Sequence, residues 1–304
     1  MPLADDTPSA DTADLRELAA RHGLHLEGEL SINELGLDYR IAIAAAVGGT
    51  RWVLRIPRRA DVSAKVDSEA RILAMLRQQV PFDVPDWRIA TKELVAYPML
   101  EDSTAIIVEP GSTTPHWVIA QDSERFADSF AVALAGLHAV PVAAADAAGM
   151  RVRTPAQARQ EVADDIDRVR REIAINDKRL NRWQRWLDDD TSWPDFCVVV
   201  HGDLYVGHVL VDDSERVTGM IDWSECCVDD PTIDMTSHLM VFGEAGLAKL
   251  IADYEAAGGR VWPRMAHHTK ERLAISPVLY ALFGLESGHA DHLAAAKAQL
   301  AAEE

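Results

Sequence analysis

The feature of the sequence that most constrains the fold is a change of periodicity near residue 100. Before it, residues 39–47 are apolar with β-branched members, residues 51–56 alternate between polar and apolar, and Gly48-Gly49 between them is typical of a turn. Residues 62–76 interrupt these strand-like runs with apolar side chains at helical spacing. After residue 100 helical spacing dominates. The pattern predicts an α+β chain, with a small antiparallel sheet followed by a larger, mostly helical part.

The length of the chain predicts two lobes. At 304 residues it exceeds the size at which a single hydrophobic core usually stops growing. We place the boundary after the strand-like run that ends at residue 99, so the predicted lobes are residues 1–99, with a short leading helix, and residues 100–304. A hinge near residues 97–102 would join them. A cleft between two lobes is an ordinary site for a ligand.

The charge of the chain narrows the classes of ligand. It has 49 acidic against 30 basic residues, a formal net charge of −19. Such a field repels nucleic-acid phosphates and anionic membranes but attracts a cationic small molecule. No run approaches the roughly 18 apolar residues of a membrane helix, and the first residues lack the pattern of a secretory signal. We therefore expect a cytoplasmic protein without a nucleic-acid or membrane role, and no protein partner is implied.

Helical patterns fill most of the second lobe. The run Thr154-Pro155-Ala156-Gln157 is typical of a helix start, because threonine caps, proline suits the first turn and glutamine stands three residues after the cap. It opens a long amphipathic stretch from Gln157 to Leu187, whose charges we interpret as a solvated face. Further helical patterns cover residues 123–137, 235–243, 247–257, 265–284 and 290–304, and Pro277 is expected to break the fourth of them.

The residues best suited to chemistry lie around a short hairpin. His201-Gly202-Asp203 precedes it, His208 comes five residues after Asp203, and Asp222 follows a second strand-like run. Residues 212–215 between the strands are typical of a turn. A turn centred near Glu215 would place His208 opposite Asp222, about 5 Å away between backbones. The two side chains could then bind one metal ion.

These side chains fit phosphoryl transfer. Mg²⁺ usually takes one or two protein carboxylates and completes its coordination with water and substrate phosphates. Asp222 with one auxiliary ligand would suffice, and Asp203 would remain free to accept the proton of an attacking hydroxyl. Histidine is an unusual ligand for Mg²⁺. Two histidines and two aspartates also suit zinc, so a zinc hydrolase that uses His201 and His208 with both aspartates is an alternative.

The order of these residues, together with two segments of the first lobe, resembles the macrolide 2′-phosphotransferases of the aminoglycoside phosphotransferase and choline kinase-like superfamily. The resemblance rests on residues 33–40, 52–58, 201–210 and 219–223. Leu-Arg-Ile-Pro-Arg within the second segment and the histidine at 208 are the marks of the macrolide enzymes. The resemblance implies a bilobal protein kinase-like fold, with a small antiparallel sheet in the N-lobe and a larger, mostly helical C-lobe.

The resemblance also implies roles for individual residues. Asp203 would be the catalytic base, Asp222 the main Mg²⁺ ligand, and His208 the second ligand in place of the asparagine usual in the superfamily. Arg55 would bind the phosphates of the donor, with Glu69 as its partner. GTP is the implied donor, with ATP possible. Four further residues would hold the purine, the first two by their backbones and the others by packing: Tyr97, Met99, Leu210 and Ile221.

The implied acceptor is the 2′-hydroxyl of the desosamine sugar of a macrolide, a large apolar antibiotic with one positive charge. Its phosphorylation would inactivate the drug and give resistance. Our candidates for the acceptor site are an apolar floor of Tyr280, Leu282 and Phe283, with Tyr205 and Trp223 flanking the reacting centre.

Two alternatives to a macrolide kinase remain open on the sequence. An aminoglycoside kinase would share the phosphoryl-transfer site but would need several acceptor-side carboxylates for a polycation. A nucleotide-binding module without turnover is the alternative from another class, because residues 33–39 contain only Gly36 and lack a glycine-rich phosphate loop.

Overall fold

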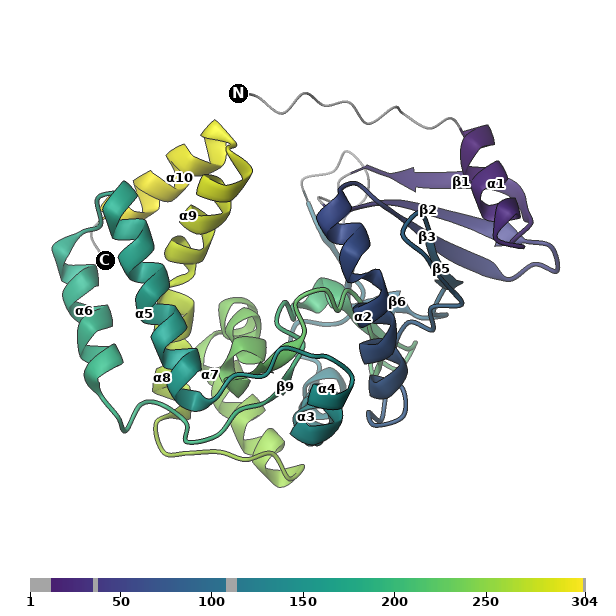
Figure 1. Cartoon of the computed structure of the whole chain (residues 1–304). Helices are drawn as coiled ribbons and strands as arrows, with labels where there is room; N and C mark the ends of the chain where they lie inside the picture. Colours follow the sequence, from purple (N-terminus) through teal and green to yellow (C-terminus); the bar gives the residue numbers. More distant parts are fainter. Residues whose placement is uncertain (1–11, 35–37, 108–113, 303–304) are drawn as a thin grey trace.

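The first part of the chain folds into a small antiparallel sheet (Figure 1). The computed structural model describes residues 12–34, 38–107 and 114–302, so Gly36, in the segment that lacks a glycine-rich loop, lies outside the described residues. Helix α1 (Thr12–Arg21) precedes five strands in the order β1-β2-β3-β5-β4, every neighbouring pair antiparallel. The strands are β1 (Leu26–Asn33), β2 (Tyr39–Ala46), β3 (Arg51–Pro57), β4 (Ile89–Ala90) and β5 (Val95–Pro98).

The predicted hairpin between β2 and β3 is confirmed. The two strands pair from Tyr39 opposite Pro57 to Ala45 opposite Arg51. Gly48 and Gly49 form the turn with φ of 101° and 87°, a backbone region in which only glycine is unstrained. This hairpin carries Arg55 into the middle of the sheet, between β2 and β5.

Helix α2 (Ala60–Leu76) contacts both parts of the chain. Val66 packs with Val95 and Tyr97 of the sheet, whereas Leu73 and Leu76 near the end of the helix belong to the large core of the second part. In Figure 1 the helix runs alongside the sheet and down toward the helical region. We call α1 to β5 the N-lobe and the rest the C-lobe; the boundary at residue 99 stays a prediction.

The segment after α2 is hydrogen-bonded to the C-lobe. The Asp83 amide donates to the Thr218 carbonyl (2.8 Å), and the Met220 amide donates to the Asp83 carbonyl (2.9 Å). Beside it, the ring of Phe82 stacks on Trp223 with 6.3 Å between centroids. The two lobes therefore share backbone hydrogen bonds and core packing well before the predicted hinge.

Helices make up most of the C-lobe, as predicted. They are α3 (Glu124–His138), α4 (Val142–Ala147), α5 (Pro155–Glu172), α6 (Asp177–Asp188), α7 (Thr236–Ala256), α8 (Met265–Ala274), α9 (Ser276–Ser287) and α10 (Ala290–Ala301). Between them lie β6 (Ser103–Thr104), β7 (Ile106–Ile107), β8 (His116–Trp117), β9 (Val198–Val200), β10 (Val209–Val211), β11 (Val217–Met220), β12 (Cys227–Asp229) and the 3₁₀ turns η1 (Val206–His208) and η2 (Pro231–Met235). Among the residues that the structure describes, no helix combines the length and apolar character needed to span a bilayer.

The predicted start of α5 is confirmed, but the long helical stretch that it opens is divided, and α4 was not predicted. Thr154 and Gln157 form the expected capping box at the start of α5. The stretch from Gln157 to Leu187 is two helices, however, because Ile173 is buried with an extended backbone and Asn176 caps α6 by accepting from the Lys178 amide.

Two predicted interruptions near the end of the chain are confirmed. Gly243, with φ of 68°, breaks the helical geometry inside α7, so the residues on either side form two helical runs. Pro277 lies in the first turn of α9, directly after the end of α8.

A buried histidine in α7 gives the fold a pH dependence that can be measured. The His238 ring stacks on Phe130 with 5.5 Å between centroids, and burial lowers its pKa to about 4. Because the unfolded chain binds this proton first, stability is expected to fall by about 2 kcal/mol as the pH drops from 7 to 5. Thermal melts of the parent protein and of His238→Phe test this. The variant should lose that part of the pH slope, and parallel profiles for the two proteins would contradict it.

Candidate active site

The loop between β9 and β10 carries Asp203. The buried ring of His201 anchors this loop through two hydrogen bonds. The His201 ring is fully buried: its Nε2–H donates to the Ile221 carbonyl (2.9 Å), and its Nδ1 accepts from the Asp203 amide (3.3 Å). Burial lowers the pKa of His201, which keeps the ring neutral. One imidazole therefore ties the loop of Asp203 to the segment that carries Asp222, and its two nitrogens are used for that purpose.

Gly202 is required by close packing. Its φ is 87°, and a Cβ at this position would lie 2.3 Å from the Glu225 carbonyl oxygen. A side chain here would displace the loop from the turn that follows Asp222. Glycine is therefore needed between His201 and Asp203 because of this tertiary contact, which the sequence motif alone does not show.

Asp234 supports the same loop, and it was missed in the sequence. Its buried carboxylate, in η2, accepts hydrogen bonds from the backbone amides of His201 (2.8 Å) and Gly202 (2.9 Å), and His138 Nε2 lies 3.3 Å away. In the sequence Asp234 is one of several aspartates after β12. Only the tertiary structure shows which of them meets the catalytic loop.

Asp234→Asn is expected to lower kcat about 10²-fold and to leave the KM for nucleotide nearly unchanged. An amide at this position replaces one acceptor oxygen by a donor that faces an N–H group, and small misplacements of a catalytic group cost this much. Steady-state kinetics test the split. Asp230→Asn is the matched control: Asp230 is equally buried in the same turn but binds Thr232, His268 and Arg272. It should lower the melting temperature without the selective loss of kcat.

The hairpin register differs by one residue from the prediction. Val209 lies opposite Met220, and the Ile221 amide donates to the His208 carbonyl (2.9 Å), so His208 does not face Asp222 along the backbone. The cause is the position of the turn, which is centred near Ser214 and not near Glu215, because Val211 lies opposite Val217. The register shift between Leu210 and Val211 then restores one of the two residues of offset.

The two side chains meet nevertheless. Asp222 has a φ of 65°, and its Oδ2 lies 3.7 Å from Nε2 of His208. A left-handed backbone at a non-glycine residue is uncommon and strained, and such residues cluster at functional sites. His208 Nδ1 lies 2.8 Å from the Asp203 carbonyl and must donate to it. The lone pair of a neutral His208 ring is therefore on Nε2, the atom that faces Asp222.

This pair fits a cation with few protein ligands. Within the described residues, no three or more His, Cys, Asp or Glu side chains are arranged around a common metal position. The zinc hydrolase alternative, which needs such a group, therefore loses its support. Mg²⁺ needs only one or two protein ligands beside a nucleotide, and Asp222 and His208 would supply them.

Asp203 is exposed at the end of its loop, beside His208. Its side chain is 63% exposed, and its Oδ2 lies 3.8 Å from His208 Nδ1. Partial desolvation raises the pKa of Asp203, the positive charge of a protonated His208 would lower it, and the carboxylate of Asp222 raises it. Because the raised pKa starts from an ordinary value of 3.8, the carboxylate is a stronger base than a fully solvated aspartate.

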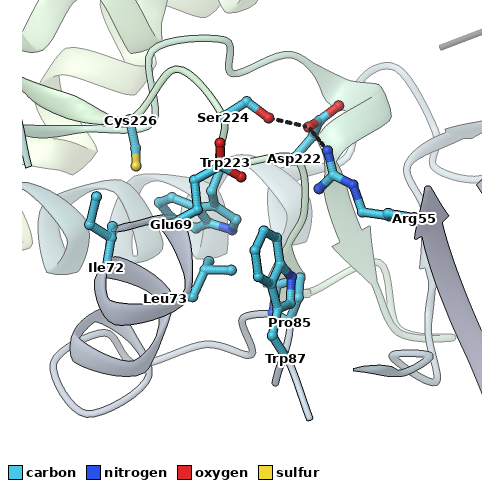
Figure 2. Close-up of a pocket in the computed structure, with 10 residues that line it drawn as sticks. All are labelled: Arg55, Glu69, Ile72, Leu73, Pro85, Trp87, Asp222, Trp223, Ser224 and Cys226. Carbon is cyan, nitrogen blue, oxygen red and sulfur yellow. Dashed lines mark hydrogen bonds and ion pairs between the residues drawn. The ribbon is translucent and has the colours of Figure 1, made fainter. Parts of the chain in front are cut away.

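Arg55 reaches the same site from β3, but not with the partner we expected. Its Nη2 lies 3.3 Å from Oδ1 of Asp222, and Figure 2 shows this contact beside the one from Ser224. Glu69 instead lies 3.4 Å from the Tyr39 hydroxyl, and the described residues show no ion pair between Glu69 and Arg55. The Arg55 guanidinium lies over the Tyr39 ring, 4.1 Å from its centroid.

The Arg55 side chain has an N–H group that is not used in a hydrogen bond. It is only 8% exposed, and its buried Nε has no hydrogen-bond partner. A buried guanidinium with an unused N–H beside Asp222 suits an anion such as a phosphate group. Phosphate binding by Arg55 stays a prediction, and the carboxylate that it contacts is Asp222.

Two of the residues predicted to hold the purine lie close together, but the expected backbone contact of Met99 needs a correction. Met99 and Leu210 line the same cavity of about 360 Å³. The Met99 amide, however, already donates to the Arg51 carbonyl (2.8 Å), and Tyr97 is buried within β5. A purine would have to use other backbone groups of the hinge than the Met99 N–H. Ile221, which precedes Asp222 in the chain, is half-buried, and its predicted contact with the purine stays a prediction.

Asp203 also lines a separate cavity of about 410 Å³ in the C-lobe. The apolar lining includes Val162 of α5, Ile275 between α8 and α9, and Leu279 of α9, which is 51% exposed. Five carboxylates and three guanidinium groups complete the lining: Glu161, Asp165, Asp203, Glu225 and Asp229 with Arg151, Arg153 and Arg272. This cavity is the candidate acceptor site.

The predicted apolar floor is on the wrong face of α9. Tyr280, Leu282 and Phe283 do not line the cavity. The Tyr280 hydroxyl lies 2.7 Å from Nδ1 of His292 in α10, and the Phe283 ring packs on the same histidine. Because α9 is apolar on nearly every side, periodicity could not identify the face that borders the cavity.

The predicted flanking aromatics have different environments. Trp223 is 4% exposed, and its indole Nε1 donates to the Met220 carbonyl (2.9 Å). It is therefore a core residue next to Asp222 and not a substrate contact. Tyr205 is 43% exposed, and its ring packs on His208 with 4.3 Å between centroids. Tyr205 therefore remains a candidate for substrate contact.

Comparison with known proteins places this geometry in a family. Residues 38–268 match the phosphotransferase enzyme family. The chain belongs to the phosphotransferase enzyme family. The phosphotransferase is 72% identical to a solved macrolide 2′-phosphotransferase type I, with a TM-score of 0.92 over 98% of this chain and 99% of that one. It is 42% identical to the macrolide 2′-phosphotransferase MphH from Brachybacterium faecium, with a TM-score of 0.89 over 96% and 98% of the two chains.

A curated relative extends the similarity. The uncharacterized protein YcbJ of Bacillus subtilis (strain 168) is 38% identical over 279 residues, which cover 91% of each chain. The predicted resemblance of the phosphotransferase to macrolide 2′-phosphotransferases is confirmed across nearly the whole chain, and so is the kinase-like fold with its small sheet and mostly helical remainder. The phosphotransferase is an enzyme that transfers a phosphoryl group to a hydroxyl.

Proposed function

We propose that this enzyme phosphorylates the 2′-hydroxyl of the desosamine sugar of macrolide antibiotics, which inactivates the drug. The observation that carries the proposal is the cavity beside Asp203, which joins an apolar wall to a carboxylate-rich edge. A macrolide has a large apolar ring and one cationic sugar, so it matches both parts. The 72% identity to a macrolide 2′-phosphotransferase type I supports the same substrate class.

In the proposed mechanism, Asp203 accepts the proton of the sugar hydroxyl as its oxygen attacks the γ-phosphorus of the donor. The bond between the γ-phosphorus and the bridging oxygen breaks, and the nucleoside diphosphate leaves. Asp222 and His208 would hold Mg²⁺, which neutralises phosphate charge when bound. Arg55, with its unused Nε, would bind phosphate oxygens.

The donor we propose is GTP, with ATP as the alternative, bound between β3 and the hinge near Met99 and Leu210. This choice rests on the resemblance, because the described hinge groups do not distinguish the two purines. Nucleoside triphosphates are kept inside cells, so we place the reaction in the cytoplasm. No protein partner enters the proposal.

One observation favours an aminoglycoside as a second candidate. The acceptor cavity has five carboxylates, which suits a polycation. Two of them are already ion-paired: Arg153 Nη1 lies 2.7 Å from Asp229, and Glu161 contacts both Arg153 and Arg151. Three guanidinium groups thus offset much of the negative charge of the five carboxylates, which favours a ligand with one cation over a polycation.

The test incubates the purified protein with Mg²⁺, GTP or ATP, and either erythromycin or kanamycin. Mass spectrometry should show the gain of one phosphoryl group on erythromycin, faster with GTP. A gain on kanamycin alone would favour the aminoglycoside candidate. Nucleotide binding without transfer to either drug would favour the module without turnover.

A further inference from the structure

Glu225 lies at the junction of the acceptor cavity and the catalytic loop. It lies in the turn between Asp222 and β12 and lines the cavity. Its backbone packs on Gly202: a Cβ at Gly202 would lie 2.3 Å from the Glu225 carbonyl oxygen and 3.1 Å from the Glu225 Cβ. The side chain of Glu225 therefore starts beside the residue that precedes Asp203.

The other acidic side chains of the cavity are less suited to bind a ligand cation near Asp203. Glu161 and Asp229 form ion pairs with Arg153, and Glu161 also contacts Arg151. Asp165 lies on α5, which forms a different wall. Glu225 is exposed, and no cationic group of the described residues is hydrogen-bonded or ion-paired to it. It is thus the available carboxylate that adjoins the catalytic loop.

We propose that Glu225 binds the ammonium group next to the acceptor hydroxyl and so selects cationic amino sugars. The inference rests on the proposed function. In desosamine the dimethylammonium is on the carbon adjacent to the one with the 2′-hydroxyl, so a hydroxyl held at Asp203 brings that cation to the edge of the cavity where Glu225 lies. Asp203 is committed to the hydroxyl proton, and a second carboxylate can then provide the ion pair. Glu225 is a specificity-determining residue in this view.

The experiment compares Glu225→Gln with the parent protein on two acceptors. One is erythromycin. The other is its N-demethyl-N-acetyl derivative, in which the same nitrogen is an uncharged amide. Glutamine keeps the size of the side chain and removes its charge. The kcat/KM for erythromycin should fall about tenfold, mainly through KM, as expected for loss of one charged contact. The kcat/KM for the uncharged derivative should change by less than about twofold, because it never used that charge.

Asp165→Asn is the competing variant, since it removes a charge from another wall of the same cavity. Its loss on erythromycin should be smaller than that of Glu225→Gln. A charge-selective loss in Asp165→Asn alone would assign the ammonium to α5 and overturn the inference. Equal losses on both acceptors in Glu225→Gln, or no loss, would overturn it as well. Thermal melts verify that both variants are folded.

The activity of the parent protein on erythromycin distinguishes a failure of the proposed function from a failure of the role of Glu225. If it transfers no phosphoryl group to erythromycin, the proposed function fails and this inference fails with it. If it does transfer, and Glu225→Gln keeps the full preference for the cationic acceptor, only the role of Glu225 is wrong.

Discussion

Asp203→Asn is expected to lower kcat by about 10² to 10⁴-fold, because the amide cannot accept the proton of the attacking hydroxyl. Nucleotide binding should be retained, since the contacts of Arg55 and the hinge are on other segments. Steady-state kinetics with erythromycin measure the first effect. The stabilisation of the folded protein by GDP and Mg²⁺ in a thermal melt measures the second.

The control for this variant is Asp213→Asn. Asp213 is an exposed carboxylate in the turn of the same hairpin, away from Asp203. It should have kinetics like those of the parent protein. If Asp203→Asn kept more than about one tenth of the activity, a different group would have to be the base.

Asp222→Asn is expected to reduce kcat/KM on the order of 10³-fold, because stabilisation of the transferred phosphoryl group by a metal is worth several kcal/mol. The loss should appear as a changed dependence on Mg²⁺ concentration. Rates measured over a wide range of Mg²⁺, with Mn²⁺ as a second cation, test this.

His208→Asn is the matched comparison for Asp222→Asn. Asparagine supplies an oxygen ligand, and the resemblance implies that it occupies this position elsewhere in the superfamily. We expect a loss of less than about tenfold, and a larger loss for His208→Ala. An unchanged Mg²⁺ dependence in Asp222→Asn would remove Asp222 from the metal site.

Local patterns were sufficient for much of the fold. The alternation and the glycine pair predicted the β2–β3 hairpin, and Thr154 with Gln157 predicted the start of α5. These features are decided by residues close in sequence, through turn conformation and capping. The break between α5 and α6 was missed because helical spacing continues on both sides of Ile173.

The site was predicted as a set of residues but not in its detailed contacts. Asp203, His208 and Asp222 lie together as expected. The one-residue difference in register is the sum of a turn centred one residue earlier than predicted and a register shift between Leu210 and Val211, and neither can be predicted from the turn residues alone. The partner of Arg55 and the role of Asp234 depend on contacts between segments distant in the chain. The cavity-facing side of α9 could not be read because its apolar residues surround the helix.

The hydrogen bonds of Asp83 with β11 imply that the two lobes would not fold well as separately expressed fragments. A cut after residue 99 would leave Phe82 and the end of α2 on one fragment and their packing partners, including Trp223, on the other. Each fragment would expose apolar surface that the intact enzyme buries. The two halves would then require co-expression to regain activity, as in fragment complementation, even though the cut falls at the predicted hinge.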